Sequence, residues 1–201
     1  MKELDKKQLL IVICLIFVIS GLIGWIYEFL FYFANSHFQT FYYRGVNFLP
    51  WINIYMYGSF LILLLTHKYK SKPILVFLIS MISTGILEYF SGYILYGVLG
   101  LTKNWDYNQE ILNFGNINGY VCLRSVLVFG LAGLFLVYIL VPFIIKLVKT
   151  NNIKPLLVIS VLLVSFVLFD ELYNFFIYKL LNLPDSTAIY KSLGFKYIYF
   201  N

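Results

Sequence analysis

Charged residues are scarce in this chain. Only 12% of its 201 residues are Asp, Glu, Lys or Arg, whereas 61% are hydrophobic and 20% are aromatic. A soluble fold of this length cannot bury so much apolar surface. The composition therefore excludes a soluble domain of any size and predicts that lipid forms part of the solvent.

The sequence signatures of common enzymes are also missing. No Gly-x-x-x-x-Gly-Lys-Ser/Thr phosphate loop occurs, so the chain cannot by itself hydrolyse ATP in the P-loop manner. It contains no nucleophile elbow, no His-Glu-x-x-His and no candidate Ser-His or Cys-His pair. Its two histidines, His37 and His67, fall in loops expected on opposite sides of the membrane. We therefore expect no catalytic residue, cofactor or metal.

Long apolar runs are what the chain does contain. A transmembrane helix needs ~20 apolar residues, and the second of the five runs is the shortest. The runs cover residues 9–34, 51–66, 73–100, 119–149 and 155–182. The first is too long for a secretory signal, and no small-residue cleavage site follows it. The sequence predicts an all-α, polytopic membrane protein with about five transmembrane helices in a single domain over residues 1–201.

The positive charges lie mainly in alternate loops. With the N-terminus inside, the inner segments hold nine of the 15 basic residues and only two of the nine acidic ones. Short cytoplasmic loops are enriched in Lys and Arg, so this asymmetry predicts an N-terminus inside and a C-terminus outside. The net charge of +6 then reports topology, because the lysines form no basic groove of the kind that binds nucleic acid.

Ionisable residues nevertheless occur within the predicted spans. Each costs several kcal/mol to insert and is therefore a functional hypothesis. They are Glu28, Glu88, Arg124, Asp170 and Glu171, all in the outer half of their spans. Four carboxylates exceed what one arginine can pair, which favours a hydrated, outward-facing pocket for a small polar or cationic solute. The alternative is that these groups only lock the helices together.

Helical spacing predicts where some of these groups point. Ser80, Thr84 and Glu88 recur at steps of four and form one polar stripe, which should face the helix bundle. Small residues at Gly21 and Gly24 precede Glu28 in the same way and should let a neighbouring helix approach closely. The adjacent Asp170 and Glu171 differ by about 100° around the helix, so only one can face the bundle axis, and the sequence does not decide which.

Two outer loops, residues 35–50 and 101–118, carry further candidates. Arg44 lies in the first and Asp106 in the second, and an ion pair between them would tie the loops together as a lid. The alternative is a pair of solvated loops with aromatic residues at the membrane interface. Asn118, before Gly119, is expected to cap the fourth helix.

Three ordered strings of residues stand out along residues 20–135. They are Gly24-Trp25-Ile26-Tyr27-Glu28; Arg44-Gly45 leading through Pro50 to Ile54-Tyr55 and Gly58; and Leu87-Glu88-Tyr89 followed by Trp105-Asp106-Tyr107 and Asn116-Ile117-Asn118-Gly119-Tyr120-Val121-Cys122-Leu123. Together they resemble the CmpB family, "putative ABC-transporter permease, type IV". Glu28, Arg44, Glu88, Asp106 and Cys122 match positions of that pattern. Leu49, Asn53, Met56, Tyr96 and Phe129 depart from it.

The resemblance implies a permease-like subunit of the bacterial cell membrane that works with a separate cytosolic ATPase. With the pocket hypothesis, it predicts ligand-binding roles for Glu28, Arg44, Glu88, Asp106, Arg124, Asp170 and Glu171. An assembly or regulatory subunit with a structural polar core is the first alternative. An intramembrane enzyme using paired carboxylates is the second.

Overall fold

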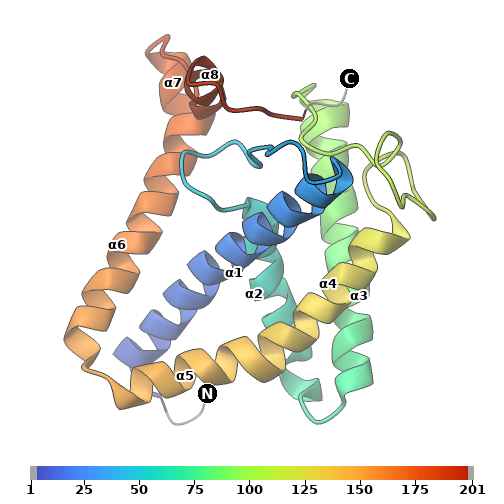
Figure 1. Ribbon diagram of the computed structural model, residues 1–201. Coiled ribbons are helices and arrows are strands. Elements are labelled where there is room, and N and C mark those ends of the chain that lie inside the picture. Colours follow the sequence, from blue (N-terminus) through green and yellow to red (C-terminus); the bar gives the residue numbers. More distant parts are fainter. Residues whose placement is uncertain (1–3, 199–201) are drawn as a thin grey trace. The chain divides into compact units, whose positions relative to one another are not determined.

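A computed structural model describes residues 4–198 (Figure 1). Those residues form helices joined by loops, with two isolated β-bridges and no strand among them. They divide into two compact units, which are described separately below. Unit 1 comprises residues 4–56 and 141–197, and unit 2 comprises residues 57–140 with Ile198.

Unit 1 is organised around one long helix. α1 (Lys6–Asn35) packs against α6 (Ile153–Leu172) and α5 (Val141–Thr150). α6 continues into the π-helical turn η4 (Tyr173–Ile177) and α7 (Tyr178–Leu180), and the short α8 (Ser186–Ser192) follows. The start of α1 is fixed by a capping box, since Gln8 N donates to Asp5 Oδ1 at 2.8 Å and Asp5 N donates back to Gln8 Oε1 at 3.1 Å.

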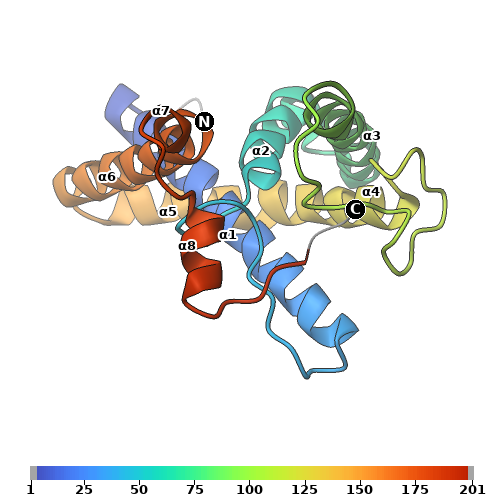
Figure 2. The same ribbon diagram turned by 90° about the horizontal axis from the view of Figure 1, so that it is seen from above.

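The loop that the sequence predicts on the outer side, residues 36–52, belongs to unit 1 and passes close to α8 (Figure 2). We call it the first outer loop. The Ser186 hydroxyl donates to the carbonyl of Val46 at 2.6 Å, and the Tyr190 hydroxyl donates to that of Phe48 at 2.5 Å. The segment after α6 therefore holds this loop in place.

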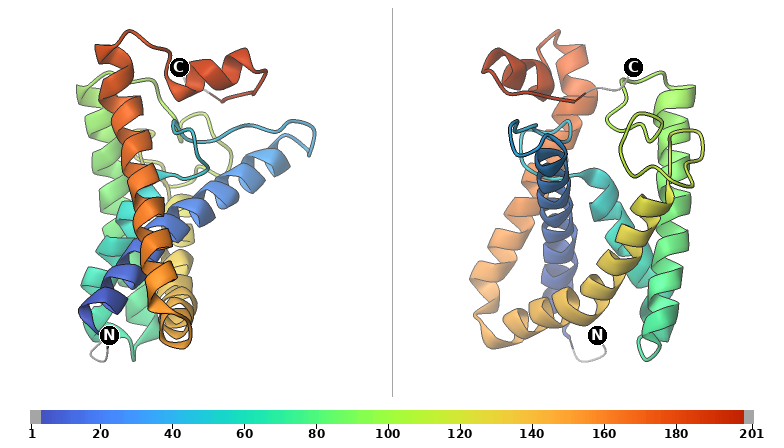
Figure 3. Two further views of the ribbon diagram at one scale, coloured as in Figure 1. Left: turned by 90° about the vertical axis from the view of Figure 1, so that its left-hand side faces the viewer. Right: turned by 45° about the vertical axis from the view of Figure 1, so that its right-hand side comes forward.

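Unit 2 is built on a helical hairpin. α2 (Asn53–Thr66) begins at the end of unit 1 and continues through η1 (His67–Tyr69), after which α3 (Pro73–Gly92) extends into the π-helical η2 (Tyr93–Val98). α3 packs against α4 (Leu123–Phe135), which is followed by the π-helical η3 (Leu136–Leu140). Figure 3 shows the second outer loop, residues 99–122, leaving the end of η2 and returning to the start of α4.

A π-helical turn at η3 has a clear cause in the sequence. Pro142, two residues further on, has no N–H to donate to the carbonyl of Tyr138, and its ring crowds that carbonyl. The helix widens locally instead of continuing with regular α-helical hydrogen bonds. The chain nevertheless stays helical from Leu123 to Thr150.

Four helices among the described residues are long and apolar enough to cross a membrane, which confirms the all-α, polytopic prediction. They are Lys6–Asn35, Pro73–Val98, Leu123–Thr150 and Ile153–Leu180. The remaining predicted span, residues 51–66, corresponds to α2, which has only 14 residues. At 1.5 Å per residue it extends about 21 Å, less than the ~30 Å of a hydrocarbon core.

The polar stripe of α3 faces inward, as predicted. Ser80, Thr84 and Glu88 are all buried, and the Ser80 side chain lies against Gly133 of α4. A methyl group at position 133 would overlap the Ser80 hydroxyl, so glycine allows the close approach of α3 and α4. In unit 1, Gly24 plays the same part, since a methyl group there would overlap the ring of Tyr55.

α4 begins at Leu123, four residues later than the sequence predicted. Asn118 and Gly119 have positive φ angles of 56° and 78°, so they form a turn and cannot start a helix. Cys122 is the N-cap instead, and its N–H donates to the hydroxyl of Ser125 at 3.3 Å. The expected cap at Asn118 is therefore wrong, and Arg124 is the second residue of the helix.

Candidate functional site

Glu28 and Arg44 form a buried ion pair in unit 1. Arg44 Nη2 lies 2.9 Å and Nε 3.0 Å from Glu28 Oε2, and the guanidinium stacks 4.1 Å from the ring centroid of Tyr32. The Arg44 side chain is only 4% exposed. The indole N–H of Trp25 donates to the carbonyl of Arg44 at 3.0 Å. The first outer loop is thus fastened to α1 by two residues of the Gly-Trp-x-x-Glu string.

Asp170 also binds the first outer loop. Its carboxylate accepts hydrogen bonds from the backbone N–H groups of Phe48 at 2.8 Å and Leu49 at 3.0 Å, and from the side chain of Asn174 at 2.8 Å. Asp170 is 3% exposed, whereas its neighbour Glu171 is only partly buried. Asp170 is therefore the member of the adjacent pair that faces the interior of its unit, the point that the sequence left open.

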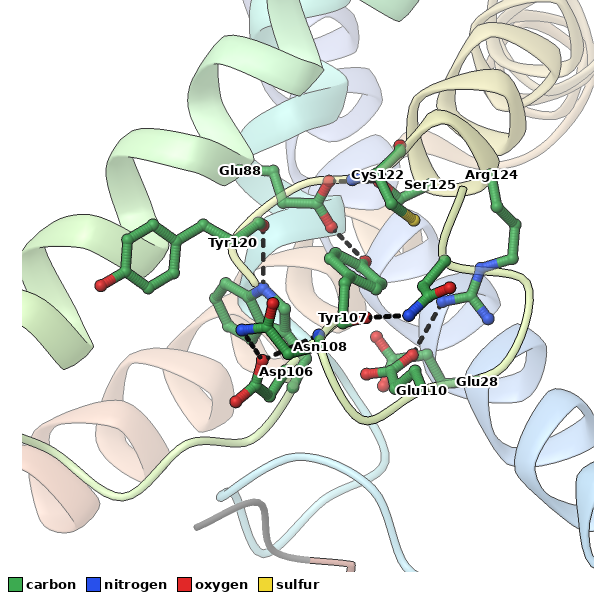
Figure 4. Close-up of polar contacts among 12 residues, drawn as sticks. Glu28, Glu88, Asp106, Tyr107, Asn108, Glu110, Tyr120, Cys122, Arg124 and Ser125 are labelled. Carbon is green, nitrogen blue, oxygen red and sulfur yellow. Dashed lines mark hydrogen bonds and ion pairs between the residues drawn. The ribbon is translucent and has the colours of Figure 1, made fainter. Parts of the chain in front are cut away.

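In unit 2, Glu88 lies at the centre of a cluster that joins α3, the second outer loop and α4 (Figure 4). Tyr107 donates its phenolic proton to Glu88 Oε1 at 2.6 Å, and the hydroxyl of Ser125 lies 2.7 Å from Oε2. Glu88 itself is 4% exposed. The bonded groups are hydroxyls, which can turn between donating and accepting hydrogen bonds.

Arg124 is paired with a residue that the sequence analysis did not single out. Its Nη2 lies 2.7 Å from Oε2 of Glu110, and its guanidinium lies 5.3 Å from the ring centroid of Tyr107. Tyr107 therefore contacts both the Glu88 carboxylate and the Arg124 cation. Among the residues that the structure describes, the buried Oε1 of Glu110 has no hydrogen-bond partner. We refer to Glu88, Tyr107, Glu110, Arg124 and Ser125 as the Glu88 cluster.

Asp106 organises the second outer loop. It accepts from the Lys103 ammonium at 2.7 Å, and from the backbone and side-chain N–H groups of Asn108 at 3.0 and 2.8 Å. Gly119, at φ +78°, packs so closely that a Cβ would overlap the Asp106 carboxylate. The ion pair expected between Arg44 and Asp106 is replaced by pairs within each unit, Arg44 with Glu28 and Asp106 with Lys103.

The surroundings of Asp106 predict a pH effect on stability. Burial raises the pKa of this carboxyl group, but the Lys103 ammonium and the Asn108 N–H outweigh it, so the pKa falls below its usual value. A lowered pKa in the folded state adds stability above the unfolded value of ~4, and this stability is lost as the pH falls through the folded pKa. We expect acidification below about pH 4 to lower the melting temperature of the wild type more than that of Asp106→Asn.

The measurement is thermal unfolding in detergent over a pH series. Asp185→Asn is the control, because it removes one carboxylate that caps α8 and lies outside the second outer loop. Equal acid sensitivity of wild type and Asp106→Asn would contradict this account of the loop.

From the sequence, no site role was expected for Glu110, Ser125 or Lys103, and Tyr107 was named only as part of a motif. Lys103 was detectable, since it precedes Asp106 by three residues. Glu110 and Ser125 were not, because Glu110 lies in an irregular loop and the sequence alone does not show which face of α4 meets α3. Among residues 4–198, no group of three or more His, Cys, Asp or Glu side chains is arranged to hold a metal ion.

Comparison with known proteins gives one result. A family model described as "Putative ABC-transporter type IV", CmpB, matches residues 15–175. The match covers both units and every residue discussed above as a candidate ligand. Neither the search of curated proteins nor the search of solved structures found a match.

Proposed function

The chain belongs to the CmpB family of type IV ABC-transporter proteins, and from this we propose that it is the membrane subunit of a transporter for a small polar or cationic solute. Four apolar helices of spanning length make it a multi-pass membrane protein. We place it in a bacterial cell membrane. The sequence has no phosphate loop for ATP, so the energy of transport comes from a separate cytosolic ATPase.

The observation that carries the proposal is the Glu88 cluster. A carboxylate within a membrane-spanning helix costs several kcal/mol to insert, so its presence indicates a function. Glu88 is bonded to hydroxyl groups of Tyr107 and Ser125, and the Tyr107 ring shows that the cluster accommodates a cation, since the Arg124 guanidinium lies 5.3 Å from its centroid. A solute ammonium could bind between Glu88 and Tyr107 while both hydroxyls turn to accept its remaining protons.

The other predicted ligand residues divide by their contacts. Asp106 and Asp170 each bind backbone or side-chain groups of an outer loop, and Arg44, which lies in the first outer loop, binds Glu28 of α1. These contacts support a role in holding the loops. Glu28 shares the role of Arg44. Arg124 stays a proposed solute ligand because it adjoins Tyr107. Glu171 stays a predicted ligand.

A structural polar core in an assembly subunit is the competing function. Asp170 favours this function, because its carboxylate accepts hydrogen bonds from two backbone N–H groups and so stabilises the loop without a ligand. The two functions differ in their partners and ligands. Purifying the tagged chain from its native membranes should recover a protein with a phosphate loop. If the solubilised chain instead recovers other membrane proteins and no ATPase, the transport proposal fails.

Orientation can be tested by labelling single cysteines in a Cys14→Ala, Cys122→Ser background. We expect Lys70→Cys to be protected from a membrane-impermeant thiol reagent in intact cells and Ile111→Cys, whose parent residue is 46% exposed, to be labelled. Permeabilised cells are the control, in which both sites should react. Labelling of Lys70→Cys alone in intact cells would reverse the orientation and place the Glu88 cluster in the cytoplasmic half.

A further inference from the structure

A short basic hairpin connects α2 and α3 in unit 2. We define it as His67–Lys72, and every residue in it is exposed. Lys68, Lys70 and Lys72 alternate along it. The backbone is ordered, because Lys72 N donates to the carbonyl of Tyr69 at 2.8 Å and the Tyr138 hydroxyl donates to the carbonyl of Lys70 at 2.8 Å. The lysines are thus presented on a fixed support.

The positive charge of the basic hairpin is not neutralised nearby. The sequence contains no Asp or Glu between Glu28 and Glu88. In the part of the chain that the structure describes, none of the three lysines forms an ion pair. The first turn of α3 has no acidic residue either. Three ammonium groups therefore stay available to a negatively charged partner.

The apolar residues beside the hairpin place it at a membrane surface. Leu64 and Leu65, at the end of α2, are 67% and 40% exposed, and Ile74, at the start of α3, is 75% exposed. Such side chains belong in the acyl-chain region. Lysines within a few residues of them extend their ammonium groups to the level of the lipid phosphates, and Tyr69 is typical of the interface between the two.

We propose that the basic hairpin binds the phosphate headgroups of anionic phospholipids. Exposed aliphatic residues lie directly beside the lysines, and this favours a bilayer as the partner. The acidic surface of a cytosolic protein would bind the lysines but would not cover the aliphatic residues. The inference does not depend on which solute the protein carries. Each juxtamembrane lysine contributes about fivefold to the affinity for an anionic membrane surface, and salt weakens the effect.

The test uses the purified full-length chain in micelles containing equal amounts of dioleoylphosphatidylglycerol and dioleoylphosphatidylcholine, with the retained lipids counted by native mass spectrometry. Wild type should retain phosphatidylglycerol preferentially. The triple variant Lys68→Gln, Lys70→Gln, Lys72→Gln should lose most of that preference, and the corresponding triple Arg variant should keep it. Melting temperatures should stay close to wild type because the three side chains are exposed.

The matched control is Lys146→Gln, Lys149→Gln, Lys154→Gln, which removes the same charge from the other predicted inner segment. The proposal requires that this control lose clearly less of its phosphatidylglycerol preference than the hairpin variant, because its lysines are spread over α5 and α6 instead of one turn. If the two Gln variants lost equal amounts of phosphatidylglycerol preference, overall charge would explain the binding and the proposal would be overturned. A hairpin variant that keeps its lipid preference but loses a co-purifying cytosolic protein would identify a protein-docking site instead, and would overturn it too.

Discussion

Replacing Glu28 by Gln is expected to lower the free energy of unfolding by about 3 kcal/mol, because the charge of Arg44 would stay buried without its partner. Arg44 is 4% exposed and is fixed by Glu28, by the Tyr32 ring and through its carbonyl by Trp25. The partial exposure of Glu28 itself, 19%, keeps the expected loss at the lower end of the range for buried pairs.

A double-mutant cycle separates the pair from general damage. Arg44→Met removes the cation while keeping much of the side-chain volume, so the double variant Glu28→Gln, Arg44→Met should be more stable than Glu28→Gln alone. Unfolding in mixed micelles of increasing denaturing detergent provides the measurement. Additive losses in the two single variants would mean that the ion pair contributes little and that Arg44 is held by packing.

Asp170→Ala is expected to have an effect of similar size, about 3 kcal/mol, because it leaves two backbone N–H groups without an acceptor. Those groups belong to Phe48 and Leu49, and the Phe48 carbonyl accepts from the Tyr190 hydroxyl of α8. Asp170→Asn should lose less, since the amide keeps one acceptor oxygen. Loss of the loop anchor should also expose residues 46–49 to protease.

Asp185→Ala is the matched control for Asp170→Ala. Asp185 likewise accepts from a backbone N–H, that of Ala188 at 2.7 Å, but at the exposed start of α8. Removing such a cap costs about 1 kcal/mol. Thermal unfolding and limited proteolysis of both variants in the same detergent make the comparison. If Asp170→Ala is no less stable than Asp185→Ala, Asp170 is not an anchor and its proposed ligand role returns.

The fold could be predicted largely from composition and periodicity. A run of about 20 apolar residues needs a lipid environment wherever it occurs, so the four long spans could be predicted from composition. The inward polar stripe of α3 could be predicted from its helical spacing. Two details differ from the sequence prediction, and both have local causes. The apolar run of residues 51–66 is longer than α2, because Trp51 and Ile52 extend the run and the helix starts only at Asn53. The start of α4 was misplaced because Asn118 adopts a positive φ.

The candidate site was predictable as a set of residues but not as a set of partners. Insertion cost marks Glu28, Glu88 and Asp170 from sequence alone. Their partners lie in irregular loops, where no period relates one residue to another, as with Phe48 for Asp170 and Tyr107 for Glu88. Asp170 was also expected to bind a ligand with its carboxylate, which in the structure accepts from two backbone N–H groups and from Asn174. A sequence does not show which backbone N–H groups a carboxylate will meet.

The central claim, that Glu88 binds solute, is tested most directly by the melting temperature of wild type and Glu88→Gln with a panel of small organic amines and amino acids. Gln can accept from Tyr107 and donate to Ser125, so the variant should melt close to wild type. A solute that binds only the folded protein raises its stability. We predict at least one amine that stabilises wild type and has no effect on Glu88→Gln. A variant that melts far below wild type and keeps the same solute response would contradict the account and make Glu88 architectural.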